Sequence, residues 1–166
     1  MARMDILDRK ILSCLGDDGR ISNREIARRL GVSEGTVRQR LRKLSETGGL
    51  RIGAQIDIET VPGLFLAFVG VKLDGRHLTE CAAQIEELPS VLSTMIVTGR
   101  YDLMAVVLAD SHQTLVDFVT NRLSHIDGVR DSETFVVLKN YSQWVPVDKL
   151  SSILSADGDD GELEFN

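Results

Sequence analysis

The sequence predicts an α+β protein in two parts, a helical N-terminal domain and a larger domain that mixes strands with helices. In the N-terminal third, apolar residues recur three times at helical spacing. From 64 to 139 the pattern changes to short apolar strands separated by two amphipathic helices. The segment Thr60-Val-Pro-Gly63 carries the best boundary signal between the two patterns. We therefore expect domains over 1–60 and 61–142, then an extension over 143–166 that ends in an acidic, disordered tail.

Charge is unevenly divided along the 166 residues. The first fifty residues carry 11 Lys and Arg against 7 Asp and Glu, a balance of +4, whereas the remainder carries 8 against 18, a balance of −10. The net charge of −6 therefore hides a basic segment. Because local charge sets the attraction to phosphate groups, this asymmetry indicates a basic contact module on an acidic body.

The composition gives no sign of export or membrane insertion. The longest apolar run, Leu64–Val71, is far too short to span a bilayer. The N-terminus, MARMDILDRK, has acidic residues where a signal peptide would need an apolar stretch. Cys14 and Cys81 lie far apart on predicted helices and are interpreted as buried, reduced thiols. We expect the protein to be cytoplasmic.

Each of the first two helices has a start signal. Asp5 is the predicted N-cap of the first helix. Ser22 and Glu25 form the capping-box pattern that starts the second helix, and Gly31 ends it. The residues expected in the core are Leu7, Ile11, Cys14 and Leu15 from the first helix and Ile26, Ala27 and Leu30 from the second.

A third helix completes a winged helix-turn-helix. Ser33 is its predicted N-cap, and its apolar stripe of Val37, Leu41 and Leu44 faces the core. The four-residue turn before it gives the spacing of a helix-turn-helix unit. Leu50–Ile58 is predicted to be a strand that forms a wing beside this helix.

The outer side of the third helix has the composition of a DNA-reading surface. Gly35 allows close approach to the major groove, Gln39 suits adenine, and Arg42, like Arg38, suits guanine. The residues expected at the DNA interface are Ser22, Asn23, Ser33, Glu34, Gly35, Thr36, Arg38, Gln39, Arg40, Arg42 and Lys43. The alternative is a solvated cationic face on an ordinary helical bundle.

The second domain is predicted to have the order βαββαβ, that of the ferredoxin-like fold. The predicted elements are strand 64–73, helix 78–88, strand 91–98, strand 102–109, helix 111–125 and strand 130–139. In this fold both helices lie on one face, so strands should alternate if the other face meets water. The first and third strands are instead apolar on both sides. We therefore expect a second subunit to cover the open face, giving a dimer that presents two reading helices to successive half-sites.

These features together resemble the Lrp/AsnC (feast/famine) family of prokaryotic regulators from about Met4 to Lys139. The matching pieces are LDRKIL, DGRISNREIARRLGVSEGTVRQRLRKL, VTGRYDL and GVRDSETFVVLK, which are specific in this order and spacing. The resemblance implies a winged helix-turn-helix, a "regulation of amino-acid metabolism" (RAM) domain, and dimers that associate into tetramers, octamers or larger rings. Many members bind an amino acid at contacts between dimers. Arg40 and Arg42 fall where the family has basic residues on its recognition helix, whereas Ile52-Gly53 departs from the Gly-Tyr of many members.

The predicted effector site centres on the loop Thr98-Gly-Arg-Tyr-Asp102, which matches the family's ligand-loop pattern. Backbone amides near Gly99 suit the carboxylate of an amino acid, Asp102 suits its ammonium group, and Tyr101 would cover it. The resemblance adds three residues to those of the loop. The expected site is Thr98, Gly99, Arg100, Tyr101, Asp102, Ser111, Thr134 and Val136. The alternative is a β-hairpin whose glycine and aspartate serve turn geometry.

The predicted function is a sequence-specific DNA-binding transcription regulator whose assembly responds to an amino acid or related metabolite. No catalytic residue, metal or cofactor is expected, because His77, His112 and His125 are scattered and no grouping has metal-ligand spacing. Two alternatives stay open. Proteins that resemble the family in both domains include sirohaem decarboxylases, which are enzymes that act on a tetrapyrrole. The other alternative is an architectural protein that binds DNA with little sequence preference.

Overall fold

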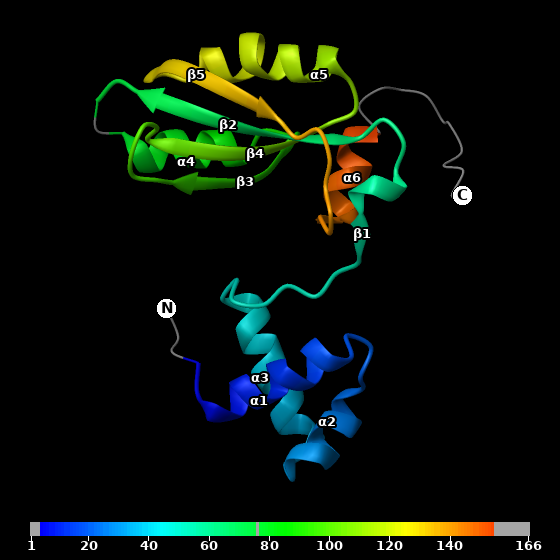
Figure 1. Ribbon diagram of the computed structural model, residues 1–166. Helices are drawn as coiled ribbons and strands as arrows, with labels where there is room; N and C mark the ends of the chain where they lie inside the picture. Colours follow the sequence, from blue (N-terminus) through cyan, green and yellow to red (C-terminus); the bar gives the residue numbers. More distant parts are fainter. Residues whose placement is uncertain (1–3, 76, 155–166) are drawn as a thin grey trace. The chain divides into compact units, whose positions relative to one another are not determined.

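A computed structural model describes residues 4–75 and 77–154 of the chain. It divides into two compact units, Met1–Gly53 and Ala54–Asn166 (Figure 1). The boundary therefore lies earlier than the expected position at residue 60. The acidic stretch that was expected to form a disordered tail lies outside the described residues from 155 onward.

Three helices form the N-terminal unit: α1 (Ile6–Asp17), α2 (Asn23–Leu30) and α3 (Glu34–Glu46). All three predicted N-caps are confirmed, and each accepts a hydrogen bond from a backbone amide of its first turn. Gly31 ends α2 with φ +67°, the left-handed conformation that favours glycine. The core of the unit consists of Ile11, Cys14, Ile26, Ala27 and Val37, as the apolar spacing predicted.

The predicted wing is wrong. Of the segment 50–58, only β1 (Gln55–Asp57) is a strand, and it pairs antiparallel with β6 (Trp144–Pro146) inside the C-terminal unit. Ile56 packs with Ile58 and Val145 in an apolar cluster of that unit. The alternating apolar residues that suggested a wing therefore serve the core of the second unit.

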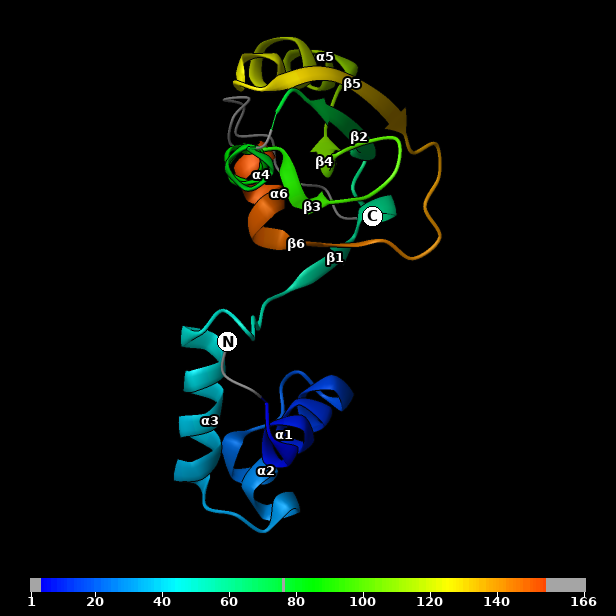
Figure 2. The ribbon, with the colours of Figure 1, turned by 90° about the vertical axis from the view of Figure 1, so that its left-hand side faces the viewer.

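The βαββαβ order of the C-terminal unit is confirmed. Its strands are β2 (Phe65–Leu73), β3 (Val91–Ile96), β4 (Leu103–Ala109) and β5 (Val129–Val136). They form an antiparallel sheet in the order β3-β4-β2-β5, with the first and third strands of the repeat at its centre. Two helices, α4 (Leu78–Glu86) and α5 (His112–Asp117), lie on one face (Figure 2).

The second helix is shorter than predicted. After α5 the chain continues as a turn of π-helix, η2 (Phe118–Arg122), and a 3₁₀ turn, η3 (Leu123–His125). The hydroxyl of Thr120 donates to the Val116 carbonyl at 2.8 Å and so competes for a helical acceptor. The apolar side is nevertheless kept, because Phe118 and Leu123 are fully buried against the sheet.

Between sheet and helices lies the main core. Along β2 and β4 every second side chain points into it, and α4 and α5 supply the other wall. The strand residues are Ala67, Val69, Val71, Leu73, Leu103, Ala105, Val107 and Ala109; those from helices and turns are Cys81, Ile85, Leu115, Phe118 and Leu123.

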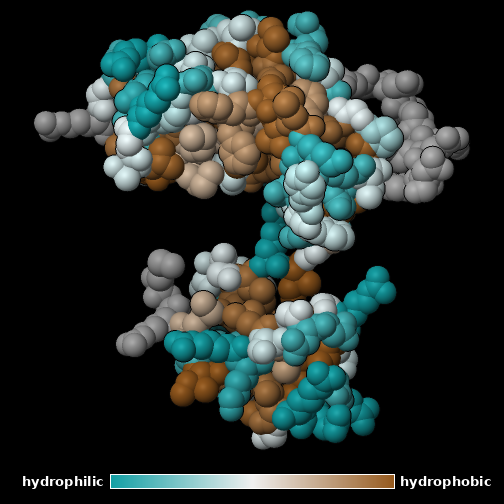
Figure 3. All heavy atoms as spheres, in the orientation of Figure 1, coloured by the Kyte–Doolittle hydropathy of each residue, from teal (hydrophilic) through white to brown (hydrophobic). Residues whose placement is uncertain are grey.

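The opposite face of the sheet is only partly open. At one end, η1 (Ile58–Thr60), β6 and α6 (Val147–Leu154) cover Leu66 and Leu108, which are 2% and 0% exposed. The expectation of a wholly uncovered face is therefore wrong, because this chain supplies its own cover there. Toward the middle of the face, Phe68, Met95 and Phe135 remain 39%, 42% and 45% exposed. Figure 3 shows apolar atoms gathered across this part of the C-terminal unit.

Candidate functional site

The outer surface of α3 is open at the positions that a groove-reading helix needs. Gln39 and Lys43 are exposed, and so is Gly35 in the first turn. A Cβ added at Gly35 would meet only the Ser33 hydroxyl, at 3.7 Å. Because nothing else surrounds this position, the backbone of the first turn is accessible to a large partner.

The hydroxyls of the predicted interface are used locally as caps. Ser22 Oγ accepts the amide of Glu25 at 3.2 Å. Ser33 Oγ accepts the amide of Thr36 at 3.1 Å and shares a hydrogen bond of 2.8 Å with the Thr36 hydroxyl. These groups hold the first turns of α2 and α3, and Asn23 is a half-buried residue at the start of α2.

Acidic partners hold most cations of the helix-turn-helix in place. Glu25 binds Arg28 at 2.7 Å and Arg29 at 2.9 Å, and these hydrogen bonds lower the pKa of the Glu25 carboxyl to about 2. On α3, Glu34 binds Arg38 at 2.6 Å, whereas Glu46 lies 3.8 Å from Arg42. The Arg42 pair is the looser of these two exposed pairs, which leaves its guanidinium the easier to redirect.

Arg40 differs from the other cations of α3. Its Nη1 atom donates to Asp5 and, at 3.2 Å, to Asp8, both at the start of α1. Only 34% of its side chain is exposed, against 70% for Arg42. The structure therefore directs Arg40 toward α1, although the sequence pattern grouped it with the outward-facing DNA-binding residues.

In the C-terminal unit, the loop between β3 and β4 is a tight connection. Gly99 has φ +122°, which favours glycine, yet a Cβ added there would meet nothing within 4 Å. The backbone conformation, rather than a close approach, is thus the reason for glycine. Asp102 accepts the amide of Leu73 at 2.9 Å and donates its own amide to Val71, so its carboxylate already has a backbone partner.

The Tyr101 ring lies against Gly70 on the open face of the sheet, where the glycine has no side chain. A Cβ added at Gly70 would come within 2.7–2.8 Å of three carbon atoms of the Tyr101 ring. The Tyr101 hydroxyl donates to Glu133, which stands opposite Gly70 in the register of β2 and β5. The ring also meets Phe135 edge to face, with centroids 6.2 Å apart.

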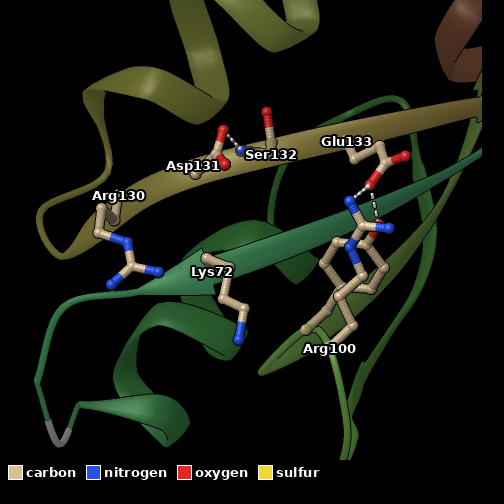
Figure 4. Close-up of a pocket in the computed structure, with 7 residues that line it drawn as sticks. Lys72, Arg100, Arg130, Asp131, Ser132 and Glu133 are labelled. Carbon is tan, nitrogen blue, oxygen red and sulfur yellow. Dashed lines mark hydrogen bonds and ion pairs between the residues drawn. The ribbon is translucent and has the colours of Figure 1, made fainter.

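Arg100 completes a charged group around this tyrosine. Its guanidinium binds Glu133 at 3.0 Å and lies 5.6 Å from the centre of the Tyr101 ring (Figure 4). Together they border a hollow of about 120 Å³ that is lined by Lys72, Arg100, Tyr101, Arg130, Asp131, Ser132 and Glu133. The hydrogen bond to Glu133 raises the pKa of Tyr101 above its usual value.

Most of this lining was missed by sequence reasoning. Lys72, Asp131 and Glu133 lie on the open face of neighbouring strands, where Asp131 stands opposite Lys72. Lys72 is the one charge within the otherwise apolar strand β2, and that interruption is the signal that could have found it.

The remaining predicted effector residues lie elsewhere in the unit. Ser111 is the N-cap of α5, beyond the far end of β4 from the loop 98–102. Thr134 and Val136 stand opposite Val69 and Ala67, on the helix-covered face. A single chain therefore does not bring the eight predicted residues together.

Comparison with known proteins identifies both units. The AsnC-type helix-turn-helix domain matches residues 4–45, and the Lrp/AsnC ligand binding domain matches residues 66–146. The HTH-type transcriptional regulator FL11 of Pyrococcus horikoshii is 31% identical over 141 residues, which cover 84% of this chain and 93% of FL11. The chain belongs to the Lrp/AsnC family.

Solved structures agree with this membership. The leucine response regulatory protein LrpA of Mycobacterium tuberculosis is 29% identical to this Lrp/AsnC chain, with a TM-score of 0.74 over 84% of the chain and 96% of LrpA. A Neisseria meningitidis transcriptional regulator crystallised as an L-Met complex is 28% identical, with a TM-score of 0.64 over 89% of the chain and 99% of that protein.

This Lrp/AsnC chain is thus a transcription regulator with a helix-turn-helix and a ligand-binding domain. The enzymatic alternative is not favoured. The three histidines lie on separate elements, because His77 is the N-cap of α4, His112 lies in α5 and His125 lies in η3. Among residues 4–75 and 77–154, no cluster of three or more His, Cys, Asp or Glu side chains is placed to hold a metal ion. Within the same ranges, no helix has the length and apolar character to cross a membrane.

Proposed function

We propose that this regulator recognises a specific DNA sequence through the outer face of α3 and that an amino acid modulates its assembly. The observation that carries the first part is the open strip along α3, where Gly35, Gln39 and Lys43 are exposed. The same helix is fixed from behind, because Val37 and Leu44 are buried in the unit. A rigid helix with an accessible polar face is what groove recognition requires.

Base reading is assigned to Gln39 and Arg42. Gln39 is exposed, and its amide matches the donor and acceptor pattern of adenine in the major groove. Arg42 is exposed and only loosely paired, so its planar guanidinium can turn to the two acceptors of guanine. Lys43 on the same helix and Arg24 on α2 are exposed and would contact phosphates, which position the protein but carry no sequence information.

A homodimer is the assembly that we propose for the protein in solution, in the cytoplasm where its DNA lies. Phe68, Met95 and Phe135 form an apolar strip on the open sheet face that the described part of the chain leaves exposed. A second copy of the same strip would bury it in a two-fold contact. Two reading helices would then address half-sites about one helical turn apart.

The effector site is proposed at the charged hollow beside Tyr101. An amino acid carries a carboxylate, which suits Lys72 and Arg130, and an ammonium group, which suits Asp131 and Glu133. At about 120 Å³ the hollow is smaller than ordinary ligand pockets, which begin near roughly 300 Å³. One chain thus offers an incomplete site that a neighbouring subunit would close, and this links ligand binding to assembly. The L-Met complex of the Neisseria relative supports an amino acid as the ligand class.

The decisive experiment maps bound DNA across the genome and then measures affinity for a recovered site and for random duplex. Gln39→Ala and Arg42→Ala are expected to weaken binding to the recovered site by about 1–3 kcal/mol each while the oligomeric state stays unchanged. Glu46→Gln is the matched control, because it frees Arg42 without removing a base contact. Normal footprints from both alanine variants would refute the assigned face, and equal affinity for both duplexes would favour the architectural alternative.

The effector proposal has its own readout. Single amino acids are added to the purified protein, and sedimentation velocity measures the distribution of oligomers. One class of amino acid should shift the distribution, and Glu133→Gln should abolish the shift. If none of the twenty standard amino acids changes either the oligomer or the DNA affinity, the effector part of the proposal is wrong.

A further inference from the structure

Arg40 is joined to α1 by a compact set of charged hydrogen bonds. Asp5 and Asp8 form a capping box, in which the amide of Asp8 donates to Asp5 Oδ1 at 2.9 Å and the amide of Asp5 donates to Asp8 Oδ2 at 3.0 Å. The other oxygen of each carboxylate accepts from Arg40 Nη1. All four carboxylate oxygens therefore have a donor, two from the backbone of α1 and two from α3.

This arrangement is a tertiary contact, unlike the other ion pairs described on α3. Glu34 and Glu46 pair with residues one turn away on their own helix, whereas Asp5 and Asp8 lie more than thirty positions before Arg40. Asp8 is also buried, with 7% of its surface exposed. Arg40 immediately follows Gln39 in the sequence, so the contact holds α3 at the same level along the helix as its reading residues.

We propose that Arg40, Asp5 and Asp8 form a positioning clamp that sets the orientation of α3 relative to α1 and thereby the fit of its reading face to DNA bases. The clamp rests on the proposed DNA-reading function. Arg40 is a positioning residue in this account and makes no contact with phosphate.

Removing the charge of Asp5 or Asp8 distinguishes a positioning role of Arg40 from a direct contact between Arg40 and a phosphate. If Arg40 bound a phosphate in the complex, Asp5 and Asp8 would compete with the DNA, and their neutralisation would strengthen binding. If Arg40 positions α3, neutralising Asp8 releases the helix, and binding to the specific site weakens even though the protein becomes more positive. The two accounts therefore predict opposite signs for the same substitution.

Salt dependence provides a second discriminator. Each phosphate contact contributes about 0.9 to the slope of log affinity against log salt concentration. Removing a phosphate-binding arginine lowers the slope by that amount, whereas removing a positioning arginine leaves the remaining contacts and their slope in place. Lys43→Ala, on the same helix, is the matched variant that should lower the slope.

The experiment measures the affinity of the full-length protein for its mapped site and for random duplex, over a series of salt concentrations. The variants are Asp8→Asn, Asp5→Asn, Arg40→Ala and Arg40→Lys, with Glu25→Gln as the control that removes an acidic charge and breaks surface pairs of α2. Asp8→Asn and Arg40→Ala should each weaken specific binding roughly tenfold, the effect of about one mismatched base pair. Affinity for random duplex after Asp8→Asn should stay equal or rise, and Arg40→Lys should recover part of the loss because it retains the charge.

Stronger specific binding after Asp8→Asn, or a salt slope lowered by about one after Arg40→Ala, would overturn the clamp. Circular dichroism checks that the total helical content of each variant is unchanged. If Asp8→Asn does not fold, Asp5→Asn carries the test, because Asp5 is exposed and contributes to the same clamp. Failure of the unmodified protein to prefer its mapped site would instead refute the proposed function itself.

Discussion

The contact between Gly70 and Tyr101 can be broken by adding a single carbon atom. In Gly70→Ala the new Cβ would lie 2.7–2.8 Å from three ring atoms of Tyr101. Carbon atoms in favourable contact lie about 3.5–4.0 Å apart, so the ring must retreat by about 1 Å. Because Tyr101 is half-buried at the surface of the sheet, we expect it to swing away from β2 rather than compress the strand.

Two opposing effects set the change in the free energy of unfolding of Gly70→Ala. Overpacking costs about 1–3 kcal/mol, whereas replacing glycine by alanine in a strand is worth about 0.5–1 kcal/mol through backbone entropy. We therefore expect Gly70→Ala to lower the free energy of unfolding by about 1 kcal/mol. In a Tyr101→Ala background the clash disappears, and the same substitution should raise the free energy of unfolding by about 0.5 kcal/mol.

The assay is urea unfolding followed by the fluorescence of Trp144, which is the only tryptophan and lies in the C-terminal unit. The four proteins of the cycle give a coupling free energy between positions 70 and 101, expected to be about 1–2 kcal/mol. A coupling within error of zero would show that the ring does not rest on Gly70. The displaced ring should also loosen its contact with Glu133. Gly70→Ala should therefore weaken the proposed shift in oligomer distribution on adding an amino acid, even where the protein remains folded.

Three further predictions follow from the described contacts. The pKa of Glu25 is about 2, below its unfolded value, so its ion pairs stabilise the N-terminal unit above about pH 4.5 and are lost as the pH falls toward 2. The midpoint temperature of thermal unfolding should therefore fall less between pH 6 and pH 2.5 in Glu25→Gln than in the unmodified protein. Phe68→Asp places a charge in the apolar strip and should convert the proposed dimer to a monomer in sedimentation velocity, whereas Val116→Asp, at an exposed apolar position on α5, should not. Leu150→Ala removes a buried side chain of α6 and should lower the free energy of unfolding of the C-terminal unit by about 2–5 kcal/mol in urea; a loss below 0.5 kcal/mol would mean that α6 does not seal this end of the sheet.

Features that depend on neighbouring residues were predictable from the sequence. The caps Asp5, Ser22 and Ser33 each bind an amide within three positions, and Gly31 ends a helix through its own backbone conformation. The main core also followed from periodicity, because a strand places every second residue on one face and a helix repeats every three to four. These signals are local, so they can be read without knowing which elements meet.

Features that depend on distant pairing could not be predicted in this way. β1 and β6 are three residues each and join segments almost ninety positions apart, and a three-residue strand has too few residues to show a period. The wing was predicted because Ile56 and Ile58 alternate, but alternation does not say which sheet they join. The contact of Arg40 with Asp5 could not be predicted for the same reason, since it becomes visible only when α1 and α3 meet.

Neighbouring residues of a strand point to opposite faces of the sheet, and this limits which of the predicted effector residues one chain can bring to a ligand. Glu133 faces Tyr101 on the open side of β5, whereas Thr134, its neighbour in sequence, stands opposite Val69 on the side of the helices. A ligand held by both must reach around β5, which is an edge strand, or must draw the two sets of residues from different subunits. Ser111, at the far end of β4 from Tyr101, makes the second arrangement the simpler one. If the predicted residues act together in this second arrangement, ligand binding is coupled to assembly by geometry alone.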